Sequence, residues 1–399
     1  MSYIVPKLAG RYNVACTDII TKVGRDRVFF RLYYPTQNAP DPQTVPRWLG
    51  DDAWNYAHGY ADYLGLPYLG WLFRYLLYGA QLPCTWNGNF VLPEGRDKLP
   101  VVVFSHGLGG TRFIYSAMCL NLASHGCIVA AIEHADGTAA TTFYYEQNEN
   151  GEKIKKWTEY KKDVGNLPNE FEIRNEQVHF RADDCIKLRN HLEEINNGNF
   201  ESVDPAIDLS VFQGAFDFEK CVMMGHSFGA GTTVAVLSKD QRFKAAVCLD
   251  PWLYPLDKEV YKNVSAIPIL FVNTEMYQSE AMLANIRKLD SDTFNVDVER
   301  LTFTVMGAVH QTHSDFPLVV PFNFLAKYFG LVGTIDPLLG VEIIVSLFSS
   351  FLGKHLNEDF GSPIEEVIKT YKDLVHVGPT LKLDEDKVEK SKNTLRSSL

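Results

Sequence analysis

The segment Cys221-Val-Met-Met-Gly-His-Ser-Phe-Gly229 decides the fold expected for this chain. Its first half is a short apolar run suited to a strand, and the small residues after Gly229 are suited to the start of a helix. Between them, Gly225-x-Ser227-x-Gly229 is the pattern of a nucleophile elbow, in which glycines relieve crowding where a strand reverses into a helix. Glycine and serine are also ordinary turn residues. The strand and helix on either side are what make Ser227 a candidate nucleophile.

The composition of the chain indicates its size class, its charge and the state of its cysteines. The chain has 399 residues, of which 46% are hydrophobic, enough for a large core in one or two domains. Its formal charge is -11 and no block of Lys and Arg stands out, which excludes nucleic acid as an expected partner. The seven cysteines are scattered, with no CxxC pair and no zinc spacing. We therefore expect buried, reduced thiols and no zinc site. We also expect no cofactor.

The start of the chain bears on location. Residues 1–8 lack the basic and apolar regions of a signal peptide, and no apolar run reaches the ~18–20 residues that span a bilayer. We therefore expect a cytoplasmic protein.

From residue 100 onward, short apolar runs alternate with segments that can hold helices. The runs lie at 101–104, 128–132, 222–224, 245–249, 269–272 and 301–305. Runs of this kind suit strands buried on both faces, so the alternation predicts a mostly parallel α/β sheet flanked by helices. Residues 14–20 and 27–34 predict a hairpin, and 175–196 is the clearest helix.

We expect a single α/β domain over residues 1–384, with insertions near 36–98 and 144–172. The second insertion is charged and rich in Asn and Lys, so we expect it to be exposed. The tail, 385–399, is charged and serine-rich, and we expect it to be disordered.

Two apolar segments have open interpretations. Asp51 and Asp52 are suited to cap a helix that precedes the segment 69–78, whose leucines repeat at helical spacing while Trp71 and two tyrosines make its other faces apolar. A helix of this kind is either buried all round or partly immersed in lipid. The apolar stretch 317–352 suits core packing, although Phe324 and the aromatic residues near it could line a lipid-facing mouth.

A serine nucleophile needs a base, and the base needs a third group to hold it. Asp250 follows the apolar run 245–249, and His310 follows the run 301–305. The order Ser, Asp, His is the one expected with this elbow. Asp257 and His313 are the alternatives, and Asp250 could also simply cap a turn.

The oxyanion of an acyl-transfer intermediate needs two backbone N–H donors. One should come from Phe228, the residue after the nucleophile. The other should come from the turn His106-Gly-Leu-Gly-Gly110 after the run 101–104, where Leu108 is the candidate. The same glycines would also suit a plain tight turn.

Several motifs together resemble the platelet-activating-factor acetylhydrolase family, the calcium-independent group VII phospholipases A2 with an α/β-hydrolase fold. The resemblance begins near Arg11 and runs to the end of the chain. The motifs that carry it are Phe30-Arg-Leu-Tyr-Tyr-Pro35, Phe104-Ser-His-Gly-Leu-Gly109, Glu133-His-Ala-Asp136, Gly225-His-Ser-Phe-Gly229, Asp250 with Trp252, and Gly307-Ala-Val-His310-Gln311. Without a signal peptide, the chain is more similar to the intracellular type than to the plasma type.

The resemblance implies Ser227 as nucleophile, Asp250 and His310 as its partners, and Leu108 and Phe228 as oxyanion donors. It implies removal of short or oxidised sn-2 acyl groups from phospholipids such as platelet-activating factor, without a metal. Ser2 departs from the glycine that N-myristoylation needs. Peripheral membrane contact would then come from the apolar segments near Trp71 and Phe324. The alternatives are a general carboxylesterase acting on soluble esters and a non-catalytic lipid-binding protein of the same fold.

Overall fold

The structure of the protein is a computed structural model, which describes residues 2–5, 7–41, 45–200, 202–203, 206–289, 298–320 and 323–381. The expected disordered tail at 385–399 therefore lies outside the described residues. The domain boundaries stay a prediction.

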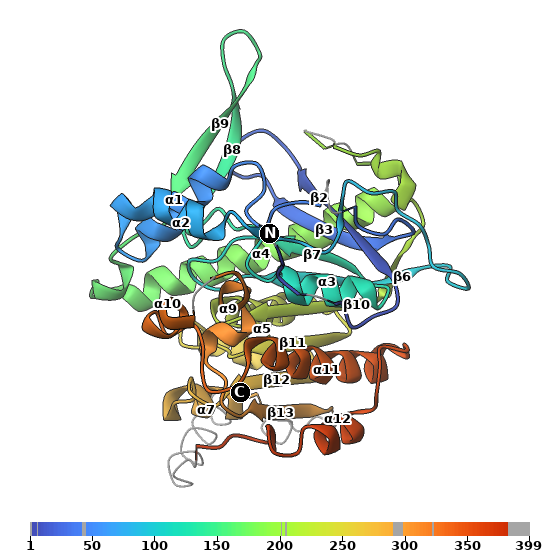
Figure 1. Ribbon diagram of the computed structural model, residues 1–399, viewed down its shortest axis with the longest axis vertical. Helices are drawn as coiled ribbons and strands as arrows, with labels where there is room; N and C mark the ends of the chain where they lie inside the picture. The colour runs from blue at the N-terminus through green and yellow to red at the C-terminus, as the bar shows by residue number, and fades with distance from the viewer. Residues whose placement is uncertain are drawn as a thin grey trace.

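Helices and short strands alternate along most of the chain (Figure 1). The helices are α1 (Ala53–Tyr63), α2 (Gly70–Leu77), α3 (Ser116–Ser124), α4 (Glu170–Asn196), α5 (Phe228–Lys239), α6 (Lys258–Asn263), α7 (Glu280–Arg287), α9 (Phe316–Val319), α10 (Asn323–Tyr328), α11 (Pro337–Leu356) and α12 (Ile364–Thr370). The strands are β1 (Ser2–Tyr3), β2 (Asn13–Ile20), β3 (Phe29–Thr36), β4 (Ala80–Gln81), β5 (Thr85–Trp86), β6 (Leu99–Ser105), β7 (Ile128–Ile132), β8 (Thr141–Gln147), β9 (Lys153–Glu159), β10 (Phe216–His226), β11 (Ala245–Leu249), β12 (Ile269–Thr274), β13 (Arg300–Val305) and β14 (Val375–Val377).

The main sheet has ten strands in the order β14-β13-β12-β11-β10-β6-β7-β3-β2-β5. The central strands, from β7 to β13, pair in parallel, while β3 pairs antiparallel with both β2 and β7. The chain runs outward from β6 to β7 and later returns to place β10 on the other side of β6. This reversal is a topological switch point, where open α/β sheets bind ligands at the carboxyl ends of their strands. The predicted parallel α/β sheet and the N-terminal hairpin are confirmed.

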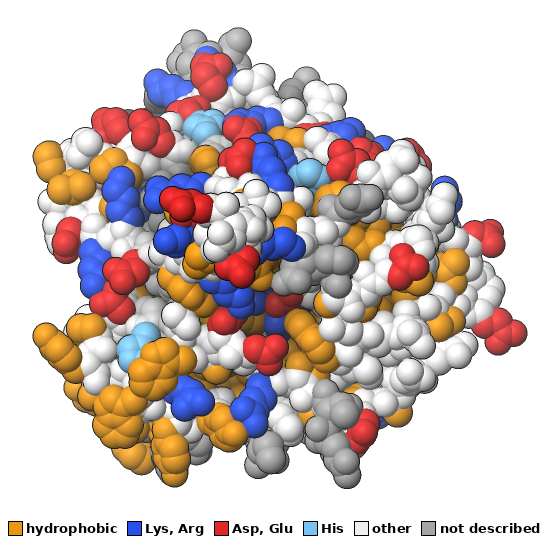
Figure 2. All heavy atoms as spheres, turned by 90° about the horizontal axis from the view of Figure 1, so that it is seen from above, with side chains coloured by type: hydrophobic (Ala, Val, Ile, Leu, Met, Phe, Trp, Pro, Cys, Tyr) orange, Lys and Arg blue, Asp and Glu red, His pale blue; other side chains and the backbone are white. Residues whose placement is uncertain are grey.

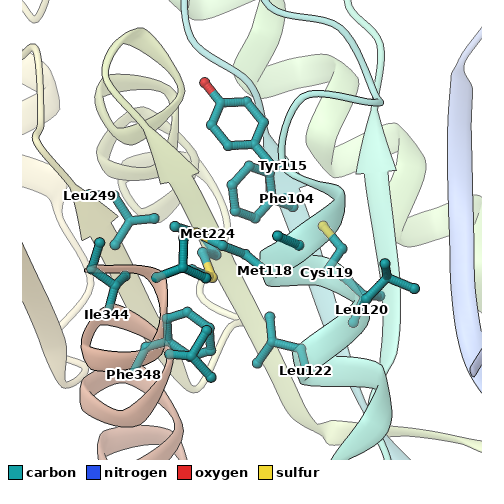
Figure 3. Packing of buried hydrophobic residues seen from close by; sticks show 14 of the residues in the cluster. Phe104, Tyr115, Met118, Cys119, Leu120, Leu122, Met224, Leu249, Ile344 and Phe348 are labelled. Atoms are coloured by element: carbon teal, nitrogen blue, oxygen red, sulfur yellow. The ribbon is translucent and has the colours of Figure 1, made fainter. Parts of the chain in front are cut away.

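Helices cover both faces of this sheet because the central strands are apolar on both sides. Along β6, Val101 and Val103 join the core on the side of α4 and α5, and Val102 and Phe104 join the opposite core. Figure 3 shows this second core, where Met224 of β10 lies between α3 and the side chains Ile344 and Phe348 of α11.

Helix α11 is the one helix in the described part of the chain that is long and apolar enough to cross a membrane. However, 67% of its most apolar window is buried inside the molecule, as expected of a core helix. The expectation that no apolar run reaches this length was therefore wrong, whereas core packing of the segment 317–352 is confirmed for α11.

Strands β8 and β9 form a separate two-stranded sheet that projects from the top of the molecule in Figure 1. Most of β9 is exposed, in agreement with the expected exposure of this charged region. Asp52 occupies the N-cap position of α1, but its side chain does not cap the helix. Instead, it binds Lys155 of β9 at 2.6 Å, so the predicted capping interaction was wrong.

Candidate active site

Ser227 lies at the sharp turn between β10 and α5, at the switch point of the sheet. Its φ is +56°, a strained value for a residue with a side chain. The two glycines of the motif are needed because the backbone is crowded here. A Cβ at Gly225 would lie 2.2 Å from the carbonyl oxygen of Gly229, and a Cβ at Gly229 would lie 2.0 Å from that of Ser105 on β6. The predicted strand, tight turn and helix are therefore all present.

Asp250 and His310 are brought together from the ends of β11 and β13. The His310 Nδ1 atom lies 3.0 Å from a carboxylate oxygen of Asp250. Asp250 is fully buried, and it also accepts hydrogen bonds from the backbone N–H of Thr274 at 2.7 Å and the Thr274 hydroxyl at 2.6 Å. Burial alone would raise the pKa of Asp250, but the charges and hydrogen bonds of His313 and His310 hold it well below its usual range. The carboxylate is therefore ionised and can orient a histidine.

The two alternative residues, His313 and Asp257, make contacts that do not suit the catalytic roles. His313 is fully buried, and its Nε2 atom lies 3.6 Å from Asp250, whereas the side chain of His310 is 23% exposed and lines a pocket with Ser227. Asp257 caps α6 through the N–H of Val260 and pairs with His179. The geometry therefore favours Asp250 and His310 as the pair beside Ser227.

Tyr277, which sequence reasoning missed, lies against this pair. Its ring stacks on the ring of His310, with centroids 3.8 Å apart and planes inclined by 18°. The pKa of Tyr277 is raised to about 12, chiefly by burial and next by Asp250, while a hydrogen bond with Ser227 opposes the rise. Among the described hydrogen bonds, none joins the Ser227 hydroxyl to His310. Such contacts often tighten only when substrate binds.

The turn after β6 lies beside the elbow, because a Cβ at Gly107 would be 3.1 Å from the Cβ of Ser227. The N–H of Gly107 donates to the hydroxyl of Tyr115, and the N–H of Gly109 donates to the carbonyl of Thr138. In the described residues, the intervening N–H of Leu108 has no acceptor, and Leu108 lines the pocket with Ser227. Phe228 is the first residue of α5, a position whose N–H has no partner within the helix. Both predicted donors are therefore free to bind an oxyanion.

A buried polar network supports this turn from below, and sequence reasoning did not identify it. Arg181 of α4 donates to the carbonyl oxygen of His106. The Nε2 atom of His106 accepts from the N–H of His134, so its proton lies on Nδ1, 2.8 Å from the carbonyl oxygen of Gly107. Burial, and next Arg181, hold the pKa of His106 well below its ordinary value. The network therefore holds a neutral His106 under the turn.

Asp315 anchors the segment that carries His310. Its carboxylate accepts from the N–H groups of Ser116 and Ala117 at the start of α3 and from the Trp48 indole. Its own N–H donates to the carbonyl of Ile114. Burial raises the pKa of Asp315 to about 7, and these hydrogen bonds act in the opposite direction.

The pocket that holds Ser227 and His310 has a volume of about 320 Å³ and a largely apolar wall. Five side chains from α2 and the turn before it form one side: Leu69, Leu72, Phe73, Leu76 and Leu77. These are the positions predicted to repeat at helical spacing. The opposite side of α2 is exposed, with Trp71 at 58% and Tyr75 at 76% of their surfaces accessible. The interpretation of α2 as buried all round was therefore wrong.

With this geometry established, the chain can be compared with known proteins. Residues 1–369 match the family described as "Platelet-activating factor acetylhydrolase, isoform II". The chain is 35% identical over 355 residues to the platelet-activating factor acetylhydrolase of Canis lupus familiaris, covering 88% of this chain and 77% of that one. The chain belongs to the platelet-activating factor acetylhydrolase family.

A second relative and a solved structure are also similar to this chain. The platelet-activating factor acetylhydrolase of Gallus gallus is 34% identical over 367 residues, covering 89% of this chain and 84% of that one. Among solved structures, a ferulic acid esterase from Streptomyces cinnamoneus superposes with a TM-score of 0.62 at 18% identity, covering 94% of this chain and 98% of that chain. This likeness, with the sheet order and the elbow, confirms the predicted α/β-hydrolase fold.

In this family member, one group of described residues has ligand atoms close enough to hold a metal ion: His226, Asp250 and His310 lie within 4.8 Å of one another. Asp250 already accepts from Thr274 and His310, and His226 Nδ1 lies 2.8 Å from the Tyr115 hydroxyl, whereas the buried Nε2 atom of His226 has no hydrogen-bond partner among the described residues. The contact between Asp250 and His310 also has the geometry that proton transfer by a histidine needs.

Proposed function

We propose that this protein is a calcium-independent serine hydrolase that removes short or oxidised sn-2 acyl groups from phospholipids such as platelet-activating factor. The observation that carries the proposal is the Asp250–His310 pair beside Ser227 in an apolar pocket, in a member of the acetylhydrolase family. The reaction class is 1-alkyl-2-acetylglycerophosphocholine esterase, a phospholipase A2 activity.

In the first half of the proposed reaction, the hydroxyl oxygen of Ser227 attacks the sn-2 carbonyl carbon and Nε2 of His310 takes the hydroxyl proton. Asp250 holds the Nδ1–H of His310, which keeps Nε2 free to accept that proton. The carbonyl oxygen becomes an oxyanion that accepts from the N–H groups of Leu108 and Phe228. Each such donor lowers the barrier by about 3–4 kcal/mol.

The intermediate then collapses. The bond between the carbonyl carbon and the sn-2 oxygen breaks, and His310 gives its proton to that oxygen, which releases the lysophospholipid. His310 next takes a proton from water, which attacks the acyl-Ser227 ester. Return of that proton to the Ser227 oxygen releases the free acid and restores the enzyme.

The size of the pocket supports a short acyl group. A volume of about 320 Å³ is at the lower end of the usual range for ligand sites, roughly 300–1,000 Å³. Its described lining residues include no Lys or Arg, so no such cation within it would pair with a phosphate. We therefore propose that the acyl group enters the pocket and the headgroup stays outside.

That same lack of a cation supports the second candidate, a general carboxylesterase acting on soluble esters. A comparison of monomeric and vesicular substrates separates the two functions. Failure to cleave phospholipid, with no response to an interface, would favour the carboxylesterase. A non-catalytic lipid-binding protein is the third candidate, and a fluorophosphonate probe that failed to label Ser227 would favour it.

The direct test is an acyl-length series of sn-2 phospholipid esters assayed in a metal chelator. The Ser227→Ala variant should lose turnover by several orders of magnitude while its unfolding transition stays the same. Ser238→Ala is the matched control, because this hydroxyl lies on the same helix and binds the carbonyl of Ala235. Activity that persisted in Ser227→Ala would refute the nucleophile assignment.

We also propose peripheral membrane contact through the segments near Trp71 and Phe324. Exposed aromatic side chains at this edge support it, with Phe324 68% and Tyr328 82% accessible. Phe329, the neighbour of Tyr328, lines the catalytic pocket, so the same edge leads to Ser227. Replacing Trp71 and Phe324 with serine should reduce co-sedimentation with phosphatidylcholine vesicles but spare hydrolysis of a soluble ester. Unchanged co-sedimentation would refute this contact surface.

For location we propose the cytoplasm, supported by the cysteines. All seven are free and buried, and the sulfur atoms of Cys16 and Cys84 lie 3.5 Å apart without a bond. Such thiols suit a reducing compartment. Fractionation of cells that express the tagged chain tests the proposal, and recovery only from the secreted fraction would refute it.

A further inference from the structure

A second cavity, of about 700 Å³, shares none of its lining residues with the catalytic pocket. It is bounded by β2 and β3, by α1 and α2 and by the hairpin of β8 and β9. Its charged lining residues are five cations and three carboxylates: Arg31, Arg47, Arg74, Arg112 and Lys155, with Asp18, Asp51 and Asp52. In a chain of formal charge -11, this cavity concentrates positive charge. Figure 2 views the molecule from the side of the hairpin, and Lys and Arg side chains lie near the middle of that face with Asp and Glu side chains among them.

Three of the cations are paired within the protein. Asp18 accepts from Arg31 and from Arg112, each at 2.7 Å, and Lys155 binds Asp52 at 2.6 Å. Burial would raise the pKa of Asp18, but Arg112 and then Arg31 hold it well below its usual range. These pairs are therefore charged, and each of the three cations already has a carboxylate partner in the cavity.

The other two cations have no carboxylate partner in the part of the chain that the structure describes. Arg47 lies over the ring of Tyr78, 4.0 Å from its centroid, and Arg74 lies 5.8 Å from the centroid of Trp54. Both arginines are exposed. Stacking orients a guanidinium group but leaves its N–H donors available to an anion.

One buried donor in the lining is also unused. Arg31 is 1% exposed, and its Nη1 atom has no hydrogen-bond partner among the described residues, although its Nε and Nη2 atoms bind Asp18. A buried donor without an acceptor costs about 1–3 kcal/mol. This donor is closed to solvent, so Arg47 and Arg74, which are exposed, are the donors that a ligand in the cavity can reach.

The size and the walls of the cavity indicate the kind of anion. A volume of about 700 Å³ holds far more than an inorganic ion, and aromatic side chains line it beside the cations, including Trp54, Tyr78 and Trp86. Arginine forks match the oxygen geometry of phosphate groups, and aromatic faces pack against organic groups. We propose that this cavity is a non-catalytic site for organic phosphate esters, with Arg47 and Arg74 binding the phosphate group.

The same chemistry belongs to a soluble phosphate ester and to a lipid headgroup, so the test has two arms. In the first, isothermal titration in phosphate-free buffer measures binding of sn-glycerol 3-phosphate and of inorganic phosphate. In the second, co-sedimentation compares phosphatidylcholine vesicles with and without phosphatidic acid. A ligand at a large excess over its Kd should also raise Tm by a few degrees.

The variant is Arg47→Gln/Arg74→Gln, and its matched control is Lys369→Gln/Lys372→Gln, which removes the same charge from an exposed part of α12 and its following turn. We expect the arginine variant to weaken binding of the phosphate ester at least tenfold and the lysine control to bind as the wild type does. Binding of sn-glycerol 3-phosphate in the first arm would show that a soluble phosphate ester is enough to occupy the cavity. If only the vesicles with phosphatidic acid increase co-sedimentation, the ligand is a lipid headgroup. The proposal is overturned if neither probe binds the wild-type protein or if the two variants bind equally.

Discussion

The substitution Asp250→Asn tests the proposed mechanism most sharply, because it keeps the shape of the side chain and turns one accepting oxygen, the one that His310 and the Thr274 hydroxyl share, into a donor. The carboxylate accepts from the N–H of Thr274 at 2.7 Å, from its hydroxyl at 2.6 Å and from Nδ1 of His310 at 3.0 Å. In the variant, the amide oxygen can face the N–H of Thr274, which turns the amide NH₂ group toward His310. Nδ1 must then accept, and the proton of the neutral imidazole moves to Nε2, where it blocks proton transfer from Ser227.

A wrong tautomer of this kind lowers kcat by about 10⁴-fold in a serine protease triad, equivalent to about 5.5 kcal/mol of barrier. We expect a loss of that order here, measured with a short-chain sn-2 ester at saturating substrate. Thr274→Val is the graded control, since it removes the 2.6 Å hydroxyl contact but keeps the backbone donor. One lost hydrogen bond of about 1.4 kcal/mol corresponds to roughly a tenfold loss of rate.

The reasoning fails if Asp250→Asn stays within about tenfold of the wild type while its unfolding transition is unchanged. The alternative base is tested in the same assay. His310→Asn should abolish turnover, whereas His313→Asn should retain most of it, because His313 is buried 3.6 Å from Asp250 and does not line the pocket. The reverse result would assign the base to His313.

Four other changes have defined outcomes. Tyr277→Phe keeps the ring on His310 but removes the hydroxyl, so the pH profile of kcat/KM should shift while KM stays near the wild-type value; an unchanged profile would refute contact with the nucleophile. Arg181→Met should lower kcat roughly 10–100-fold by loosening the turn after β6, whereas Arg189→Met, a buried arginine elsewhere on α4, should not; equal effects would indicate a general loss of packing. Leu72→Trp should narrow the pocket and move the kcat/KM preference toward shorter acyl chains, and an unchanged preference would place the acyl group elsewhere. Burial raises the pKa of Asp315 to about 7, so the native state keeps a proton that the unfolded chain releases near pH 4. The free energy of unfolding should therefore fall as pH rises from about 4 to 7. Urea unfolding of Asp315→Asn should lack this fall in stability.

The strands and the order of the candidate residues could be predicted because their signals are local. A parallel strand buried on both faces is a continuous apolar run, and each candidate residue follows such a run directly. Ser227, Asp250 and His310 were therefore found by position along the chain. Their contacts, including the part played by Thr274, required the sheet order.

Other features depend on residues far apart in the chain. The sequence of α2 has apolar residues on every face. It is therefore compatible both with a fully buried helix and with a helix that lines a pocket on one side and is exposed on the other. The capping expected of Asp52 failed because Lys155, 103 positions away, is a stronger partner. Strand β9 has no alternating pattern because both of its faces are largely exposed. Arg181 lies within an ordinary charged helix, and only the packing of α4 under the turn shows its contact.

The position of β12 explains how the site is held together. In the sheet, β12 lies between β11, which carries Asp250, and β13, which precedes His310. The residues at its carboxyl end therefore reach both partners: Thr274 donates twice to Asp250, and Tyr277 stacks on His310. Because neither residue forms or breaks a bond in the proposed reaction, substitutions there should change the orientation and basicity of the histidine while the nucleophile stays intact. The carboxyl end of β12 and the segment after it are thus where the rate and pH dependence of this active site can vary without loss of its chemistry.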